Sequence, residues 1–274
     1  MLKARILTAI VVLPLFLSAL FYLQDIFWAA FLLALTVIGS REWSSLSQFS
    51  VKDTILFMLL TTLVGGELLF LLSESVKVNV YSLDFMWIYI LSVVFWIVGA
   101  PLYLKQFYAI KSPFIWMLIG WLLLLSTCLA LYQLRAISPL LLLGLMATIW
   151  ISDTAAYFTG RAFGKHKLAY TISPNKTWEG VAGALMAVLI YALAWDFWVT
   201  EETLTPTLVP LLIVMAILGI VGDLYESLIK RHAGVKDSGR ILPGHGGILD
   251  RIDALISTLP FAILVLLIFY SPSL

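Results

Sequence analysis

Acidic and basic side chains are concentrated in one stretch of this chain, residues 222–253, which lies between two long apolar runs. Its acidic residues are Asp223, Glu226, Asp237, Asp250 and Asp253, and its basic residues are Lys230, Arg231, Lys236, Arg240 and Arg251. Charge at this density, beside segments apolar enough to span a membrane, is energetically costly and therefore indicates a function. Carboxylates hold hard divalent cations, and Lys and Arg bind phosphate. The stretch predicts a site for metal and phosphate chemistry at a membrane surface.

Helical spacing divides the acidic residues into two stripes. The first stripe is Asp223, Glu226, Ser227 and Lys230, at i, i+3, i+4 and i+7 of one helix face. The second stripe is Asp250, Asp253 and Ser257. We predict that Asp223, Asp250 and Asp253 converge inside a helix bundle. Oxygen-only ligands favour magnesium over zinc at such a point.

A basic, glycine-rich segment connects the two stripes. Its candidate phosphate-binding residues are Lys230, Arg231, Lys236, Arg240, Gly244, His245, Gly246 and Gly247. Backbone N–H groups of a glycine-rich turn can approach an anion closely. Carboxylates, a hard metal, basic side chains and such a turn are the usual equipment of phosphoryl or nucleotidyl transfer. For the basic residues alone, membrane topology is a sufficient explanation, and a histidine in such a turn is more often a packing residue than a proton shuttle.

A second polar cluster spans residues 152–180, and its candidate substrate-binding residues are Asp153, Ser173 and Lys176. The cluster is not a P-loop, because its glycine spacing is wrong and His166 stands where Ser or Thr is required. We expect residues 173–177 to form a turn that leads into a helix, with Ser173 or Thr177 as its cap.

Composition identifies a polytopic membrane protein. Of the 274 residues, 62% are hydrophobic and 12% are charged, and the mean hydropathy is +1.02, far from the values of soluble domains. A net charge of +1 argues against a nucleic-acid-binding protein. The single cysteine, Cys128, excludes an intrachain disulfide and a thiolate zinc site.

The apolar runs predict an all-α fold with nine membrane spans. The spans are residues 6–23, 26–39, 55–72, 85–100, 114–133, 138–157, 180–198, 207–229 and 249–270. Helices are required because the runs show no period-two alternation. The second run is short, and only Gln24 and Asp25 separate it from the first. We expect these two runs to form a tight hairpin or a partly re-entrant pair.

The distribution of Lys and Arg predicts the orientation. With the N-terminus in the cytoplasm, 15 of the 17 basic residues fall in cytoplasmic segments, and only Lys77 and Arg135 fall on the other side. The C-terminus is then on the side opposite to the N-terminus. The first five apolar runs are nearly pure hydrocarbon, and residues 1–150 are expected to be a scaffold of about five helices. Residues 151–274 are expected to be the catalytic part, with cytoplasmic loops at 158–179 and 230–249.

Residues 227–253 resemble the signature of the phosphatidate cytidylyltransferases, also called CDP-diacylglycerol synthases. The matching positions are Ser227, Lys230, Arg231, Lys236, Asp237, Pro243, Gly244, His245, Gly246, Gly247, Asp250, Arg251 and Asp253. The segments Gly222–Leu224 and Ser173–Gly180 also look like this family. The resemblance covers about the C-terminal half of the chain.

The resemblance implies an enzyme that converts CTP and phosphatidic acid into CDP-diacylglycerol and pyrophosphate. It implies an essential Mg²⁺ and a second, monovalent cation (K⁺) in the acidic site. The implied metal-linked carboxylates are Asp223, Asp250 and Asp253, which with Lys230 and Arg231 are the candidate catalytic residues. Ser227, Lys230, Arg231 and Lys236 would contact phosphates. The partners are then CTP, phosphatidic acid and membrane lipid, with no nucleic acid, while the oligomeric state stays open, a homodimer included.

The short N-terminus favours a bacterial inner-membrane protein whose active site is on the cytoplasmic side. Two other functions stay open. One is a different metal-dependent lipid-phosphate transferase. The other is a cation-coupled transporter, which predicts repeated halves and broken helices near the midplane. Neither of those features is visible in the sequence.

Overall fold

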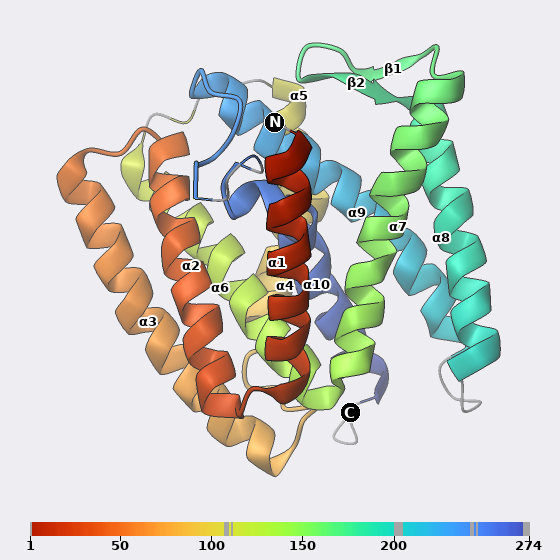
Figure 1. Ribbon diagram of the computed structural model, residues 1–274. Helices are drawn as coiled ribbons and strands as arrows, with labels where there is room; N and C mark the ends of the chain where they lie inside the picture. Colours follow the sequence, from red (N-terminus) through yellow and green to blue (C-terminus); the bar gives the residue numbers. More distant parts are fainter. Residues whose placement is uncertain are drawn as a thin grey trace.

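The computed structural model describes residues 2–106, 110, 112–199, 205–241, 244 and 246–270. These residues form a bundle of long helices with one small β-hairpin at one end (Figure 1). The elements are α1 (Leu2–Tyr22), α2 (Asp25–Leu46), α3 (Val51–Val78), α4 (Met86–Val94), η1 (Phe95–Gly99), α5 (Ala100–Gln106), α6 (Pro113–Ile137), α7 (Pro139–Phe163), β1 (Lys167–Ala169), β2 (Ser173–Thr177), α8 (Trp178–Val199), α9 (Thr205–His232) and α10 (Leu249–Tyr270).

The helices confirm an all-α polytopic membrane protein with about nine spans. Within the described ranges, eight helical runs are long and apolar enough to cross a membrane, if α4, the π-helical turn η1 and α5 are counted as one run, Met86–Gln106. The apolar part of α1 in those ranges is shorter, Ile10–Tyr22. Each of the nine predicted segments therefore corresponds to one helical run.

Helix α2 is longer than predicted. It spans 22 residues, from Asp25 to Leu46, whereas the apolar run ends at Gly39. The added turns carry polar residues that lie inside the bundle, and Ser40, Glu42 and Ser44 are all buried. The Ser44 hydroxyl donates to the Ser40 carbonyl oxygen at 2.8 Å, which satisfies it within the helix. The option of a short, partly re-entrant second segment is therefore wrong, because tertiary burial carries this helix past its apolar part. The other predicted option, a tight helical hairpin, is confirmed, since only Leu23 and Gln24 separate α1 from α2 (Figure 1).

The predicted turn at residues 173–177 is a β-strand. Strand β2 pairs antiparallel with β1, in the register Lys167 with Thr177 and Ala169 with Ser173. Ile172, in the connecting turn, is buried against Leu224 and Leu228 of α9. This contact between distant segments holds the hairpin on the bundle. A contact of this kind cannot be predicted from the local sequence pattern.

Thr177 is the helix cap, as one of the two predicted options. Its hydroxyl oxygen accepts a hydrogen bond from the Gly180 N–H at 3.1 Å at the start of α8. Ser173 begins β2 and is not the cap. The predicted loop 158–179 thus contains the last turn of α7, which ends at Phe163, and the hairpin.

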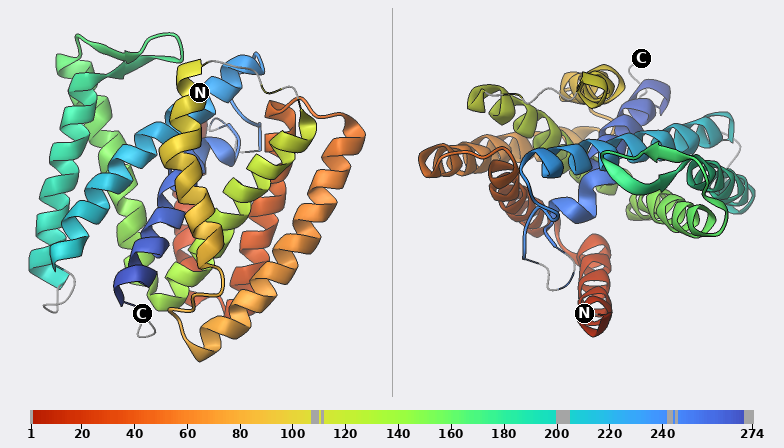
Figure 2. Two further views of the ribbon diagram at one scale, coloured as in Figure 1. Left: turned by 180° about the vertical axis from the view of Figure 1, so that it is seen from behind. Right: turned by 90° about the horizontal axis from the view of Figure 1, so that it is seen from above.

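The two ends of the bundle differ in character. The N-terminus, the hairpin and the segment after α9 lie at one end, and the C-terminus lies at the other (Figures 1 and 2). An odd number of spans requires this arrangement of the termini. The assignment of the hairpin end to the cytoplasm is a prediction from the Lys and Arg count.

Helices α9 and α10 make a close contact below the hairpin end. The Ser257 hydroxyl of α10 donates to the Leu218 carbonyl oxygen of α9 at 2.8 Å. A Cβ atom at Gly222 would lie 2.6 Å from the Ser257 Oγ and 2.7 Å from the Asp253 carbonyl oxygen. Only glycine permits this close approach of α9 to α10. The approach places the two acidic stripes side by side.

We expect Gly222→Ala to lower the thermal unfolding midpoint of the purified protein in detergent. The added methyl group overlaps backbone on α10, and overpacking of this kind costs about 1–3 kcal/mol. Gly66→Ala is the matched control, because the nearest atom to its Cβ, Leu33 Cδ2, would be 3.7 Å away. Equal midpoints for the two variants would contradict the close contact between α9 and α10.

Candidate active site

The Lys230 side chain is the centre of a buried charged cluster at the hairpin end of α9. Its Nζ donates to Glu226 Oε2 at 2.7 Å and to Asp250 Oδ1 at 2.8 Å. The side chains of Lys230, Glu226 and Asp250 are 11%, 9% and 5% exposed. An ammonium group buried to this degree needs such partners, because desolvation disfavours an isolated charge. The cluster therefore ties α9 to the first turn of α10.

The second oxygen of Asp250 organises the segment between α9 and α10. Asp250 Oδ2 accepts from the Ser238 N–H at 2.8 Å, from the Ser238 hydroxyl at 3.0 Å and from the Gly247 N–H at 2.8 Å. Gly246 has a φ of +85°, and a Cβ there would lie 2.5 Å from the same oxygen. The glycine-rich turn thus closes around this carboxylate, and its Gly247 N–H is directed at protein in this structure.

Glu42 of α2 is a member of this network that sequence reasoning missed. Its carboxylate accepts from the Ile248 N–H at 3.0 Å, from the Leu249 N–H at 2.8 Å and from the Ser238 hydroxyl at 3.1 Å. Glu42 is 4% exposed. An acidic residue within a membrane helix was an available signal, but the predicted second span ended three residues earlier.

Asp223 is paired with the hairpin. Its Oδ2 lies 2.6 Å from Lys176 Nζ of β2, and its Oδ1 accepts from the Ser227 hydroxyl at 3.2 Å. Asp153, an exposed residue of α7, is within electrostatic range of both Asp223 and Lys176. The structure thus joins the two polar clusters of the sequence, and it does so through a strand that the sequence did not predict.

The predicted convergence of Asp223, Asp250 and Asp253 on one point is not observed. Across the described ranges, no three carboxylate, histidine or cysteine side chains are grouped closely enough to hold one metal ion. The physical reason is that Lys230 and Lys176 already neutralise Asp250 and Asp223. The assignment of these aspartates as metal ligands stays a prediction.

Spare acceptor capacity remains in the acidic cluster. Asp253 is half-buried, its Oδ1 accepts from the Ala254 N–H at 2.8 Å, and it lies within electrostatic range of Asp223 and Glu226. Glu226 Oε1 is buried without a hydrogen-bond partner. Unsatisfied carboxylate oxygens are what a hard cation binds. The carboxylate oxygens of Asp223, Glu226 and Asp253 are thus of the donor type that magnesium prefers, although among the described residues they are not grouped as one metal site.

The remaining predicted residues lie around the cluster. Arg231 is exposed, and its Nε donates to the Ile172 carbonyl oxygen of the hairpin at 3.5 Å. Lys236 and Arg240 are exposed on the segment after α9, and neither forms an ion pair with the described residues. Ser173 is half-buried at the start of β2. His245, predicted to contact substrate, lies outside the described residues.

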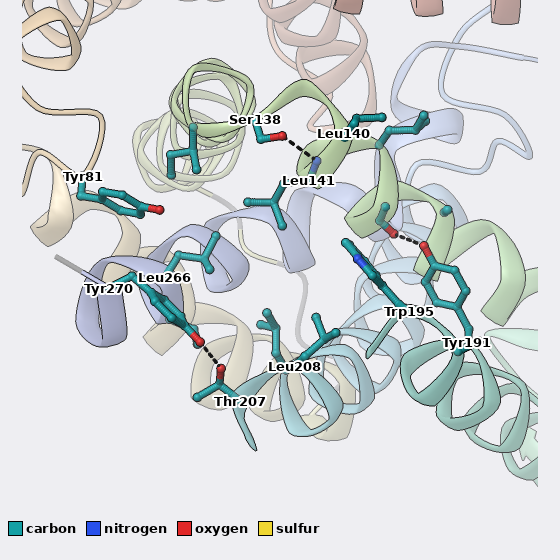
Figure 3. A pocket seen from close by; sticks show the side chains of 17 residues that line it. Tyr81, Ser138, Leu140, Leu141, Tyr191, Trp195, Thr207, Leu208, Leu266 and Tyr270 are labelled. Carbon is teal, nitrogen blue, oxygen red and sulfur yellow. Dashed lines mark hydrogen bonds between the residues drawn. The ribbon is translucent and has the colours of Figure 1, made fainter. Parts of the chain in front are cut away.

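A separate cavity of about 900 Å³ lies at the opposite end of the bundle (Figure 3). It is lined by α7, α8, α9 and α10, and its walls include Leu141, Trp195 and Leu266. Its lining holds no charged residue, and the Thr207 and Tyr270 hydroxyl groups hydrogen-bond to each other at 2.5 Å. The cavity has no equipment for phosphate chemistry, so the charged cluster is the candidate active site.

The fold and the cluster define a polytopic helical membrane protein. Its candidate site is buried at one end of the bundle and contains charges of both signs. The model of the Cytidylyltransferase family matches residues 3–269. The chain is 34% identical to the phosphatidate cytidylyltransferase of Haemophilus influenzae over 95% of this chain and 97% of that protein. It is 36% identical to the phosphatidate cytidylyltransferase of Pseudomonas aeruginosa over 95% of each chain. A Staphylococcus saprophyticus phosphatidate cytidylyltransferase is 46% identical over 50% of this chain and 53% of its own. The chain belongs to the cytidylyltransferase family.

The family match covers both halves of the chain, whereas the signature residues occupy only the second. The first half supplies Glu42, which contacts the turn before α10 directly. The matched range therefore agrees with a site built from both halves.

We expect Gly246→Ala to destabilise the protein more than Gly234→Ala. Both glycines have positive φ, +85° and +70°, and a left-handed conformation costs a non-glycine residue roughly 1–2 kcal/mol at either position. Only Gly246 has the Asp250 carboxylate against its Cβ, since nothing lies within 4 Å of a Cβ at Gly234. Thermal unfolding of the two variants, with limited proteolysis of the segment after α9, measures the difference. Equal losses would contradict the observed closure of the turn around Asp250.

Proposed function

We propose that this protein transfers the cytidylyl group of CTP to phosphatidic acid and forms CDP-diacylglycerol and pyrophosphate. Membership of the family and the names of its full-length relatives support this reaction. The observation that carries the proposal is the buried Glu226, Lys230 and Asp250 set, joined to Asp223 and Lys176, at one end of a membrane bundle. Charges of both signs at a helix end suit a reaction between two polyanions, one soluble and one lipid.

The reaction forms one phosphorus–oxygen bond and breaks another. A phosphate oxygen of phosphatidic acid attacks the α-phosphorus of CTP, and the bond from that phosphorus to the bridging oxygen breaks. Pyrophosphate leaves with the electron pair of the broken bond. The nucleophile is already an anion, so no strong general base is required. The main obstacle is repulsion between the reactants, which positioned positive charges reduce.

The cationic side chains divide into buried and exposed groups. Lys230 is held in one position by two carboxylates and is suited to stabilise charge at a fixed point. Lys176 and Arg231 lie at the junction of the hairpin and α9, and Lys236 and Arg240 are exposed on the following segment. These four residues are suited to attract the triphosphate and the lipid phosphate.

Magnesium is part of the proposal, and carboxylates of the acidic cluster would hold it after a rearrangement: the predicted Asp223 and Asp253, with Glu226 in place of the predicted Asp250, which is paired with Lys230. When bound, it supplies charge neutralisation on the phosphates and stabilises the leaving pyrophosphate. In this proposal Lys176 would exchange its contact with Asp223 for a contact with substrate phosphate. A monovalent cation in the same acidic cluster remains an expectation from the family resemblance, and the oligomeric state stays open, a homodimer included.

The proposed location is a bacterial inner membrane, with the candidate site facing the cytoplasm. The helices establish an integral membrane protein, and the relatives are bacterial proteins. CTP then arrives from the cytosol and phosphatidic acid from the bilayer. Both meet at the hairpin end, where the Lys and Arg residues concentrate.

We expect the purified protein to form CDP-diacylglycerol from CTP and phosphatidic acid only when Mg²⁺ is present. Asp250→Asn should lower kcat by roughly 100-fold or more. It removes the negative charge that pairs with Lys230 and accepts the hydrogen bonds of the turn. Asp84→Asn, an exposed residue near the opposite end, is the control. Unchanged turnover in Asp250→Asn would refute the site, and turnover of ATP or GTP as readily as CTP would favour a different lipid-phosphate transferase.

The orientation is testable by cysteine labelling, because the only native cysteine, Cys128, is buried. Lys236→Cys places a thiol on the exposed segment after α9, and Val78→Cys places one at the other end of the bundle, where Val78 is 90% exposed. A membrane-impermeant maleimide should label only Lys236→Cys in inside-out vesicles. The same reagent should label only Val78→Cys in right-side-out vesicles, and the reverse pattern would overturn the predicted topology.

A further inference from the structure

The buried carboxylate of Glu42 comes from α2, in the half of the chain that carries none of the signature residues. It is 4% exposed and accepts three hydrogen bonds, from the Ser238 hydroxyl, the Ile248 N–H and the Leu249 N–H. Two of the donors, Ser238 and Ile248, belong to the segment that connects α9 to α10, and the third, Leu249, is the first residue of α10. A single side chain from a distant helix thus fixes both the middle and the end of this segment.

Two of the three donors are backbone N–H groups at the start of α10. The first N–H groups of a helix have no partner within the helix, and negative charge beside them is favourable. The Glu42 carboxylate accepts hydrogen bonds from the Ile248 and Leu249 N–H groups, which directly precede Asp250 in the chain. The position of the first turn of α10, and hence of Asp250, therefore depends on a carboxylate in α2.

Ser238 connects Glu42 to Asp250. Its Oγ lies 3.1 Å from Glu42 Oε2 and 3.0 Å from Asp250 Oδ2. A hydroxyl has one proton, so the two carboxylates share it. From Asp250 the chain of contacts continues to Lys230 and Glu226. This network links α2, the connecting segment, α10 and α9 without interruption.

Glu42 is enclosed by protein rather than open to substrate. Cβ atoms built at Gly239 and Gly247 would overlap its carboxylate oxygens, so two glycines pack directly against it. Among the described residues, its hydrogen-bond donors are the three named above. The side chain therefore acts on the reaction, if at all, through Asp250 and Lys230.

We propose that Glu42 is a positioning residue, which sets the place of Asp250 and through it the Lys230 ammonium for cytidylyl transfer. The inference rests on the proposed function for its kinetic readout and on the geometry of the network alone for its structural readout. The alternative is a purely structural role, in which Glu42 stabilises the fold and leaves the reaction unaffected in molecules that are folded.

Glu42→Gln is the most informative substitution. Glutamine has almost the same shape, so no cavity or clash is created. It replaces one acceptor oxygen by an NH₂ group, which then faces a donor. Glu67→Gln is the matched control, since Glu67 is an exposed acid in a neighbouring membrane helix, α3. Ser238→Ala removes the hydroxyl between Glu42 and Asp250 and tests the same link independently.

Hydrogen exchange of full-length protein in nanodiscs tests the geometry without turnover. Glu42→Gln should raise the exchange rate of the amides in peptides covering 238–250 by roughly 10- to 100-fold, because the Ile248 and Leu249 N–H groups lose a charged acceptor. Glu67→Gln should leave these rates unchanged. Exchange rates equal to wild type in Glu42→Gln would overturn the proposal, whatever the activity of the protein.

Steady-state kinetics test the link to Lys230. Glu42→Gln and Ser238→Ala should each lower kcat by roughly 10- to 100-fold, as small displacements of catalytic groups do, with KM for CTP changed by less than about threefold. The double variant should lose less than the product of the two single losses, because both act through Asp250.

Several results would overturn the proposal. One is wild-type kcat in folded Glu42→Gln. Another is full multiplicativity of the two losses in the double variant. If Glu42→Gln does not fold, normal kcat in Ser238→Ala overturns it equally. If wild-type protein forms no CDP-diacylglycerol, the proposed function fails, and hydrogen exchange still tests whether Glu42 fixes the segment before α10.

Discussion

A lysine ammonium can lie inside a membrane bundle only when carboxylates surround it, because an unpaired charge removed from water costs several kcal/mol. Lys230 meets this constraint through Glu226 on its own helix and Asp250 on the next. Each partner then needs its own support. Asp250 accepts hydrogen bonds from the Ser238 and Gly247 N–H groups, and the Ser238 hydroxyl in turn donates to Glu42. Much of the polar architecture at this end of the bundle follows from the need to satisfy one buried cation and its partners.

The same constraint explains why glycines lie where they do. Carboxylates that accept several hydrogen bonds must be approached by backbone, and a Cβ atom blocks that approach. Gly246 and Gly247 lie against Asp250 and Glu42, and Gly222 allows α9 and α10 to meet below the cluster. The glycine-rich turn, which the sequence suggests as a phosphate cradle, is thus also a device for enclosing protein carboxylates. The two roles are compatible if substrate binding rearranges the turn, and the structure shows the second of them.

The hairpin connects the second polar cluster to the charged site on α9. It carries Lys176 from the second polar cluster to Asp223 on α9, and Ile172 anchors it by burial against Leu224 and Leu228. Charged groups at the junction are thereby more exposed than those around Lys230. A rigid interior cluster beside a more open, cationic rim is a reasonable division for an enzyme of this family, since one part must hold its geometry while the other exchanges ligands.

The sequence by itself determined the membrane class, the nine helical runs and the helical faces that carry the acidic stripes, because hydrophobic length and i, i+4 spacing are local properties. It also identified the family through the signature residues between Ser227 and Asp253. Only the tertiary structure decided which charges pair. Lys176 with Asp223, Lys230 with Asp250 and Glu42 with the start of α10 join residues 20 or more positions apart. Such pairs depend on how helices pack and on which buried groups must be neutralised, and no spacing within a single segment encodes that.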